Sequence, residues 1–180
     1  MKDREVVLGV CGGIAAYKAA MLTSRLVQAG SGVSVVMTSS AAEFVGAATF
    51  AALTGRQVHS AAIDPASSPL GGHIELAERG DLLCIAPATA NFLAKAATGL
   101  ADDLLSTLYL AFEGPVLIAP AMNAAMWQQP AVQRNVAQLR EDGAMFVDPE
   151  EGWQSCRRTG AGRMAEPDTI LEAIVQTLNS

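Results

Sequence analysis

The feature that most constrains the fold is a regular alternation of short apolar runs with longer stretches of helical composition. The apolar runs cover residues 5–11, 33–37, 81–86, 115–119 and 144–147. They are apolar along most of their length instead of at every second position, which is typical of strands covered on both faces. The helical stretches cover residues 14–29, 41–53, 91–98, 101–112, 124–142 and 167–178. We therefore expect an α/β three-layer sandwich with a central parallel sheet and right-handed crossovers.

Length and composition favour a single domain spanning residues 1–180. With 51% hydrophobic and only 17% charged residues, the chain is not an intrinsically disordered one. The low charged fraction also favours an oligomer interface. A net charge of −6, without a run of basic residues, argues against a nucleic-acid partner. No apolar stretch reaches the ~18 residues of a membrane helix, so we expect no membrane partner.

The three cysteines are scattered and contain no CxxC pair. This pattern indicates neither a disulfide framework nor a zinc site. We therefore expect a reducing, cytoplasmic location and no bound metal.

The turn after the first apolar run carries two glycines, Gly12 and Gly13, followed by Ile14 at a helix start. Glycines there let backbone N–H groups approach an anion, and a helix N-terminus adds partial positive charge. The second run ends in three hydroxyls, Thr38, Ser39 and Ser40, without the acidic residue that would hold an adenosine ribose. The pattern favours the phosphate of a mononucleotide over NAD. A tight turn with a helix cap and no ligand remains the alternative.

Residues 60–72 and 148–166 are the least regular segments, and we expect long loops of the kind that form lids or binding elements. His73 follows the first segment and Cys156 lies in the second. Taken alone, a loop histidine is usually a solvated surface residue. Cys156 beside Arg157 and Arg158 could equally be an exposed thiol without a catalytic role.

Five segments in a fixed order favour a more specific interpretation. They are residues 12–18 (GGIAAYK), 73–74 (HI), 87–91 (PATAN), 120–127 (PAMNAAMW) and Cys156 with 160–164 (GAGRM). In this combination the chain resembles the flavin-dependent cysteine decarboxylase family, whose PASANT and PxMNxxMW motifs correspond to the third and fourth segments. Two positions depart from the family pattern, because Phe92 replaces a Thr or Ser and Arg157 replaces a Gly.

The resemblance implies a flavodoxin-like, Rossmann-like fold with bound FMN, and homotrimers that can assemble further into dodecamers. It is greatest to the members that decarboxylate 4′-phosphopantothenoylcysteine to 4′-phosphopantetheine in coenzyme A biosynthesis. Residues 148–166 would then be a substrate clamp. Two related functions stay open: oxidative decarboxylation of a peptide C-terminal cysteine, and a non-catalytic flavin-binding role in regulating a protein phosphatase.

The resemblance also assigns roles to individual residues. Cofactor-binding residues are Gly12, Gly13, Ile14, Thr38, Ser39, Ser40, Ala88, Thr89, Ala90, Asn91 and Ala121. Substrate-binding residues are Met122, Asn123, Arg163 and Met164. His73 is the expected acid/base and Cys156 the expected proton donor to the product. Because Asn123 is neutral, it can orient a carboxylate that must leave as CO₂ without stabilising its ground state as a lysine would.

Overall fold

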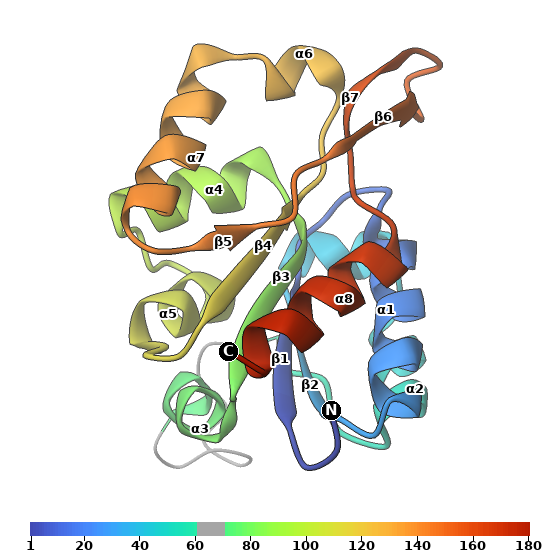
Figure 1. The fold of residues 1–180 in the computed structure, drawn as a ribbon, viewed down its shortest axis with the longest axis vertical. Coiled ribbons are helices and arrows are strands. Elements are labelled where there is room, and N and C mark those ends of the chain that lie inside the picture. Colours follow the sequence, from blue (N-terminus) through green and yellow to red (C-terminus); the bar gives the residue numbers. More distant parts are fainter. Residues whose placement is uncertain (61–70) are drawn as a thin grey trace.

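The computed structural model describes residues 1–60 and 71–180, and its centre is a five-stranded sheet of order β2-β1-β3-β4-β5 (Figure 1). The strands are β1 (Glu5–Val10), β2 (Gly32–Met37), β3 (Leu82–Ala88), β4 (Val116–Pro120) and β5 (Met145–Phe146). Each strand is parallel to its neighbours. The predicted parallel sheet is confirmed, with the strand order of flavodoxin-like folds.

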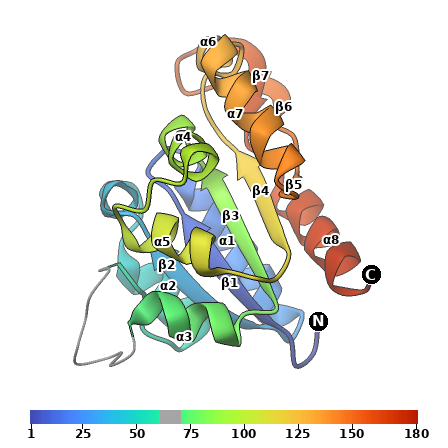
Figure 2. The ribbon, with the colours of Figure 1, turned by 90° about the vertical axis from the view of Figure 1, so that its left-hand side faces the viewer.

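Helices cover both faces of the sheet (Figure 2). One face carries α1 (Ala16–Gln28), α2 (Ala47–Thr54) and α8 (Pro167–Leu178). The other carries α3 (Gly72–Arg79), α4 (Ala90–Thr98), α5 (Leu104–Ala111) and α7 (Pro130–Glu141). This arrangement is the predicted three-layer sandwich.

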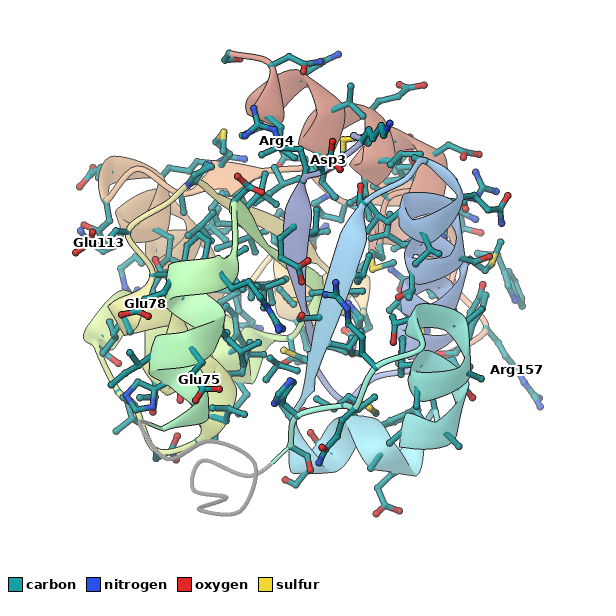
Figure 3. All side chains as sticks on the ribbon, turned by 90° about the horizontal axis from the view of Figure 1, so that it is seen from below. Asp3, Arg4, Glu75, Glu78, Glu113 and Arg157 are labelled. Atoms are coloured by element: carbon teal, nitrogen blue, oxygen red, sulfur yellow. The ribbon has the colours of Figure 1, made fainter. Side chains whose placement is uncertain are left out.

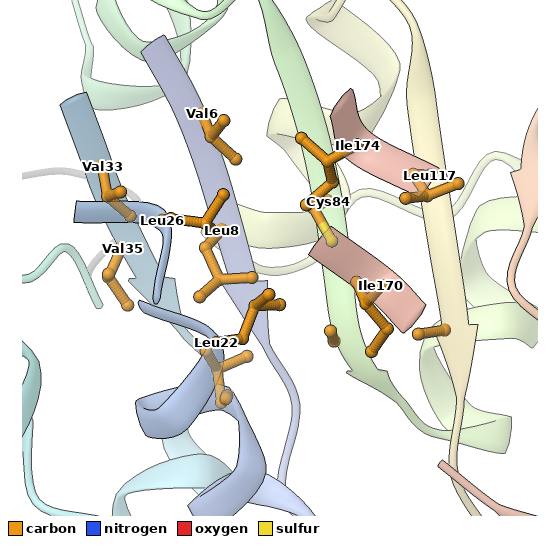
Figure 4. Packing of buried hydrophobic residues seen from close by; sticks show 14 of the residues in the cluster. Val6, Leu8, Leu22, Leu26, Val33, Val35, Cys84, Leu117, Ile170 and Ile174 are labelled. Atoms are coloured by element: carbon orange, nitrogen blue, oxygen red, sulfur yellow. The ribbon is translucent and has the colours of Figure 1, made fainter. Parts of the chain in front are cut away.

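The residues of β1 show why the strands are apolar at successive positions. Val6 and Leu8 are buried in a cluster with Leu22 of α1 and Ile170 of α8 (Figure 4). Val7, between them, points to the opposite face and is buried there in the cluster of α3, α4, α5 and α7. Since successive side chains of a strand point to opposite faces, a strand between two helical layers needs apolar residues throughout.

Two predicted helices are each divided in the structure. Instead of one helix over residues 41–53 there is a short 3₁₀ helix, η1 (Ser39–Glu43), followed by α2. Instead of one helix over 124–142 there are α6 (Ala124–Trp127) and α7. Pro130 has no N–H to continue a helix and disfavours helical backbone in the residue before it, so the helix restarts at the proline.

The segment predicted as a loop at residues 148–166 is a β-hairpin, which corrects the sequence-based expectation. Its antiparallel strands are β6 (Glu150–Trp153) and β7 (Thr159–Arg163). Helix α3 was also not expected. Residues 61–70 of the other predicted loop lie outside the described residues. Across the described ranges, no helix is both long and apolar enough to cross a membrane.

Candidate functional site

Four turns meet at the carboxyl edge of the sheet, where β1, β2, β3 and β4 each lead into a helix. Three of these helices are capped by side chains. Thr38 Oγ1 accepts from the Ala41 N–H at 3.3 Å, and Thr89 Oγ1 accepts from the Phe92 N–H at 3.3 Å. Asn123 caps α6. The first turns of α1 and α4 therefore direct free N–H groups and partial positive charge toward this edge, which favours an anionic ligand.

A cavity of about 550 Å³ opens at this edge, within the size range of small-molecule sites. Its walls come from the β1–α1 turn, the start of α4, the β4–α6 turn and the hairpin. The predicted site residues that line it are Gly12, Gly13, Ile14, Thr89, Ala90, Ala121, Met122, Asn123, Cys156, Arg163 and Met164. Residues distant in the sequence thus share one cavity.

A second cavity of about 80 Å³ contains the hydroxyl groups of the β2–η1 turn. Thr89 lines both cavities, so the two adjoin. The lining residues are Cys11, Thr38, Ser39, Ser40, Thr89, Asn91, Phe92, Lys95 and Asp103. Its polar groups are hydroxyls, an amide and one ion pair.

The titratable groups of the small cavity are shifted by their neighbours. Burial raises the pKa of the Cys11 thiol to about 12, so this cysteine is a neutral part of the wall. Hydrogen bonds to Asp102 and Asp103 raise the pKa of Lys95. Burial alone would raise the pKa of Asp103, but the hydrogen bonds from Lys95 (2.7 Å) and Ser106 lower it overall. The ion pair therefore stays charged at neutral pH.

The two glycines of the first turn have different surroundings. A Cβ on Gly12 would lie 2.4–2.6 Å from atoms of Ser40, so the first and second turns pack against each other without room for a side chain. A Cβ on Gly13 would meet nothing within 4 Å. Gly13 lines the main cavity, so its bare backbone is open to a ligand there. Together with the hydroxyls of the β2–η1 turn, this cradle suits a phosphorylated cofactor.

Asn123 presents its amide in one orientation. Its Oδ1 accepts a hydrogen bond of 2.9 Å from the Met126 N–H, which caps α6. Since the oxygen is used in this way, the amide nitrogen is the end left for a ligand. Among the hydrogen bonds of the described residues, none uses Nδ2 of Asn123. The side chain therefore offers two N–H donors, which suits a carboxylate.

A backbone hydrogen bond joins the hairpin to the β4–α6 turn, and ion pairs of Arg163 hold the two strands together at that end. The Met122 N–H donates to the Gly162 carbonyl at 2.9 Å. Arg163 pairs with Glu150 at 3.0 Å and with Glu166 at 2.9 Å. Cys156 lies in the turn between the two strands, exposed and without a disulfide partner. The thiol is thus carried on an arm that is anchored beside Asn123.

A buried lysine connects the hairpin to helix α1. Lys18 is only 6% exposed, and its Nζ donates to the Met164 carbonyl and to Glu166 Oε1, both at 3.0 Å. The hydrogen bond from Lys18 is the main cause of the lowered pKa of Glu166. Because Lys18 follows the glycine turn by one helical turn, the ion pair ties the end of the hairpin to the phosphate-type cradle.

Comparison with known proteins identifies the family. The flavoprotein family model matches residues 1–179. The chain belongs to the flavoprotein family. The coenzyme A biosynthesis bifunctional protein CoaBC of Bacillus subtilis (strain 168) is 47% identical over 172 residues, which are 96% of this chain and 42% of that protein. The chain therefore spans less than half the length of this curated relative.

Solved structures of related flavoproteins match this chain over nearly its whole length. A cysteine-to-serine variant of PPC decarboxylase, complexed with pantothenoylaminoethenethiol, matches with a TM-score of 0.88 and 30% identity, covering 100% of both chains. The FMN-dependent cysteine decarboxylase SpaF matches with a TM-score of 0.84 and 38% identity, covering 98% of this chain and 96% of its own. The predicted membership of the flavin-dependent cysteine decarboxylases is confirmed, as is the flavodoxin-like fold.

His73 is separated from the rest of the predicted site within one copy of this flavoprotein. It lies in the first turn of α3 and lines neither of the two cavities described. Helix α3 lies at the opposite end of the molecule from α6 and the hairpin (Figure 1). Seen from below, Glu75 of α3 and Arg157 of the hairpin also lie at opposite edges (Figure 3). Ala88, at the end of β3, is fully buried and lines neither cavity.

Several residues of the flavoprotein's cavity were not predicted. The most informative are Lys18, Trp153, Gln154 and Glu166. Lys18 had a usable signal, since it is the only charged residue in the first eight positions of α1. Gln154 had none, because a glutamine two residues before a cysteine is an ordinary surface pattern. Phe92, which departs from the family pattern, is buried and packs edge-on against Tyr109 with 5.8 Å between ring centroids.

Proposed function

We propose that this chain binds FMN and decarboxylates 4′-phosphopantothenoylcysteine (PPC) to 4′-phosphopantetheine in coenzyme A biosynthesis. The observation that carries the proposal is the shared cavity of the glycine cradle, the Asn123 amide and the Cys156 thiol. The names of the relatives support it, since CoaBC is a coenzyme A biosynthesis protein and PPC decarboxylase is named for this substrate.

The cofactor would be held by backbone more than by charge. The N–H groups of residues 12–14 and the hydroxyls of Thr38, Ser39 and Ser40 would bind its phosphate. Residues 89–91 and Ala121, which line the two cavities, would surround the remainder of the cofactor, with Ala88 buried behind them. Bound FMN supplies a reversible two-electron acceptor, which the side chains of this protein cannot provide.

Asn123 would orient the substrate carboxylate through Nδ2, with its Oδ1 held by the α6 cap. Met122, Met164 and Arg163 would complete the substrate side of the cavity. Cys156 would then give its thiol proton to the product, and the hairpin that carries it would exclude water from the reacting atoms. His73 would serve as acid/base for the substrate thiol.

The position of His73 supports an oligomeric enzyme. A site that needs this histidine must receive it from a second copy, because α3 lies at the other end of its own chain. We infer a homotrimer, with dodecamers as the possible higher assembly. Three free cysteines, two of them buried, suit a reducing cytoplasmic location.

The peptide-cysteine alternative is less well supported. An enzyme that ends at the oxidised enethiol product needs no proton donor on a clamp, whereas here Cys156 lines the cavity beside Asn123. The phosphatase-regulator alternative needs FMN binding without turnover. An assay of decarboxylation separates all three functions.

The test is reconstitution with FMN followed by incubation with PPC. We expect a yellow protein with an oxidised-flavin spectrum, calorimetric binding of FMN, and 4′-phosphopantetheine as the product by mass spectrometry. Gly13→Ala should weaken FMN binding about tenfold because its Cβ would enter the cradle. Gly46→Ala is the matched control, since that glycine is equally open but lines neither cavity. A colourless protein that takes up no FMN would refute the proposal.

A further inference from the structure

Gln154 makes an unusual number of contacts for one side chain. It is the first residue after β6 and is 8% exposed, although the next residues of the hairpin turn are all exposed. Its Oε1 accepts from the Ala124 N–H at 3.1 Å and from the Cys156 thiol at 3.6 Å. Its Nε2 faces the carbonyls of Ala161 (3.1 Å), Gly160 (3.4 Å) and Met122 (3.5 Å).

These contacts determine which way the amide points. The Nε2 end meets only carbonyl oxygens, and the Oε1 end meets only an N–H and an S–H. The reversed amide would oppose like groups at every contact. A nearly buried amide with all of its groups satisfied is a rigid connection, because breaking it leaves polar atoms unpaired.

Gln154 connects the loop that carries Asn123 with the hairpin that carries Cys156. Met122 and Ala124 are the two backbone neighbours of Asn123, and Gln154 contacts both of them. Its other partners belong to the hairpin and include the thiol itself. The hairpin also approaches this loop closely at Gly162, where a Cβ would lie 2.4 Å from the Met122 carbonyl oxygen. One amide thus sets the position of the hairpin thiol relative to Asn123.

We propose that Gln154 is a positioning residue that holds the Cys156 thiol in register with the carboxylate-binding amide of Asn123. This inference rests on the proposed function for its catalytic consequence only. If the thiol leaves its position, the carboxylate can still be bound and lost, but the proton reaches the enethiol product late. The enzyme would then release enethiol in place of the saturated thiol. The two electrons taken from the substrate would stay on the bound FMN, and dioxygen in the assay buffer would have to accept them before the next turnover.

The first experiment does not depend on the proposed function. Iodoacetamide should alkylate only Cys156 in the folded protein, because Cys11 and Cys84 are fully buried. Gln154→Met keeps the side-chain volume but removes both polar ends. We expect it to alkylate about fivefold faster at pH 7.5, the equivalent of one lost hydrogen bond to the thiol. Glu151→Gln, on the exposed side of β6, is the control that should match the wild type.

A second variant separates the two ends of the amide. Gln154→Glu keeps an acceptor oxygen for Ala124 and Cys156 but loses the donor to the three carbonyls. We expect it to alkylate no faster than the wild type. Gln154→Glu alkylating as fast as Gln154→Met would overturn the role of the acceptor oxygen, even if Gln154→Met proved poorly folded.

The second experiment measures the ratio of enethiol to 4′-phosphopantetheine released from PPC. We expect Gln154→Met to raise this ratio at least about fivefold, with FMN affinity unchanged. Wild-type ratios and alkylation rates in Gln154→Met would refute the inference. If the wild type releases no product from PPC, the proposed function fails, and the alkylation rates still decide whether Gln154 holds the thiol.

Discussion

At the scale of single residues, the side-chain amide of Asn123 faces two different environments. The oxygen caps α6, and the nitrogen is the end left for a substrate carboxylate. The structural role and the proposed binding role therefore meet in one residue, and a single substitution to alanine would remove both. The two roles can be separated because aspartate keeps the capping oxygen and loses the donor.

We expect Asn123→Asp to fold as stably as the wild type and Asn123→Ala to lose about 1 kcal/mol of unfolding free energy with the cap. Asn123→Asp should nevertheless weaken substrate binding about 10- to 100-fold, since a hydrogen bond to a charged group is replaced by repulsion between carboxylates. Urea denaturation and the KM for PPC measure the two effects. Equal KM values for Asn123→Asp and wild type would contradict the binding role.

At Arg157 the backbone conformation itself affects the stability of the protein. Its φ is +62°, in the left-handed region that favours glycine, and its side chain extends away from the ribbon (Figure 3). The conformation closes the hairpin turn, in which the Arg157 N–H donates to the Gln154 carbonyl at 2.9 Å. Arg157, which replaces the glycine of the family pattern, therefore closes the turn with a backbone strain that glycine would not have.

We expect Arg157→Gly to raise the unfolding free energy by about 0.5–1 kcal/mol through release of this strain. Arg158→Gly is the matched control, since it removes the same charge from a neighbouring residue whose φ is not positive. That variant should lose stability, because glycine makes the unfolded chain more flexible. Chemical denaturation of both variants checks the prediction, and a loss of stability in Arg157→Gly would show that the turn is not strained.

At the scale of elements, α1 and the hairpin are held together by the pair of Lys18 and Glu166. In the folded protein, Lys18, followed by Arg163, lowers the pKa of Glu166 below its ordinary value of 4.5. A lowered folded-state pKa means that the unfolded state binds the proton more tightly. The pair therefore stabilises the fold fully above about pH 4.5 and loses this contribution as the pH falls through the folded-state pKa.

We expect the stability advantage of wild type over Lys18→Met to shrink between pH 6 and pH 3.5. The Glu166 side chain is 43% exposed, so the pH-dependent part should stay below about 1 kcal/mol. Urea denaturation across this pH range measures it. Glu166→Gln, which removes the titrating group, should show the same flattened pH profile as Lys18→Met. An advantage that stays constant with pH would contradict the assignment.

The sheet strands and the hairpin differ in how well the sequence predicts them. The five strands were predictable because double-sided burial demands continuous apolar runs, as in β1. The hairpin was not, because β6 and β7 contain Gly152, Gly160 and Gly162 and no β-branched residue except Thr159. Its strands are stabilised by contacts distant in the sequence, such as Arg163 with Glu150 and Gln154 with Ala124. Local propensity carries no signal of such contacts.

At the scale of the whole molecule, the motifs indicated about half of the residues that line the candidate cavity, but not how the complete site is assembled. The motifs indicated which residues share a cavity, because three of the four turns that follow parallel strands contribute to it. They gave no indication that α3 would carry His73 to the other end of the chain. Periodicity describes one copy, whereas a site shared between copies depends on surfaces that meet only in the oligomer.

Helix α3, which carries His73, lies at the other end of the chain from the cavity, so mixed oligomers of two variants can test whether His73 acts across copies. At PPC concentrations well below the raised KM of Asn123→Asp, we expect His73→Asn and Asn123→Asp each to be nearly inactive alone. In oligomers formed from equal amounts of the two, some sites combine the intact His73 of one copy with the intact cavity of another. Random assembly makes about a quarter of the sites complete, so about a quarter of wild-type activity should return.

The control is a mixture of Asn123→Asp with Cys156→Ser, whose substitutions lie in the same cavity. Every cavity in that mixture carries one of the two substitutions whichever copies meet, so it should form no more saturated product than the two variants form alone. Turnover of PPC after co-refolding measures both mixtures. If the first mixture remains as inactive as its components, His73 does not act across copies. Because α3 is remote from the cavity of its own chain, the histidine would then lose its catalytic assignment, while Asn123 and Cys156 would keep theirs.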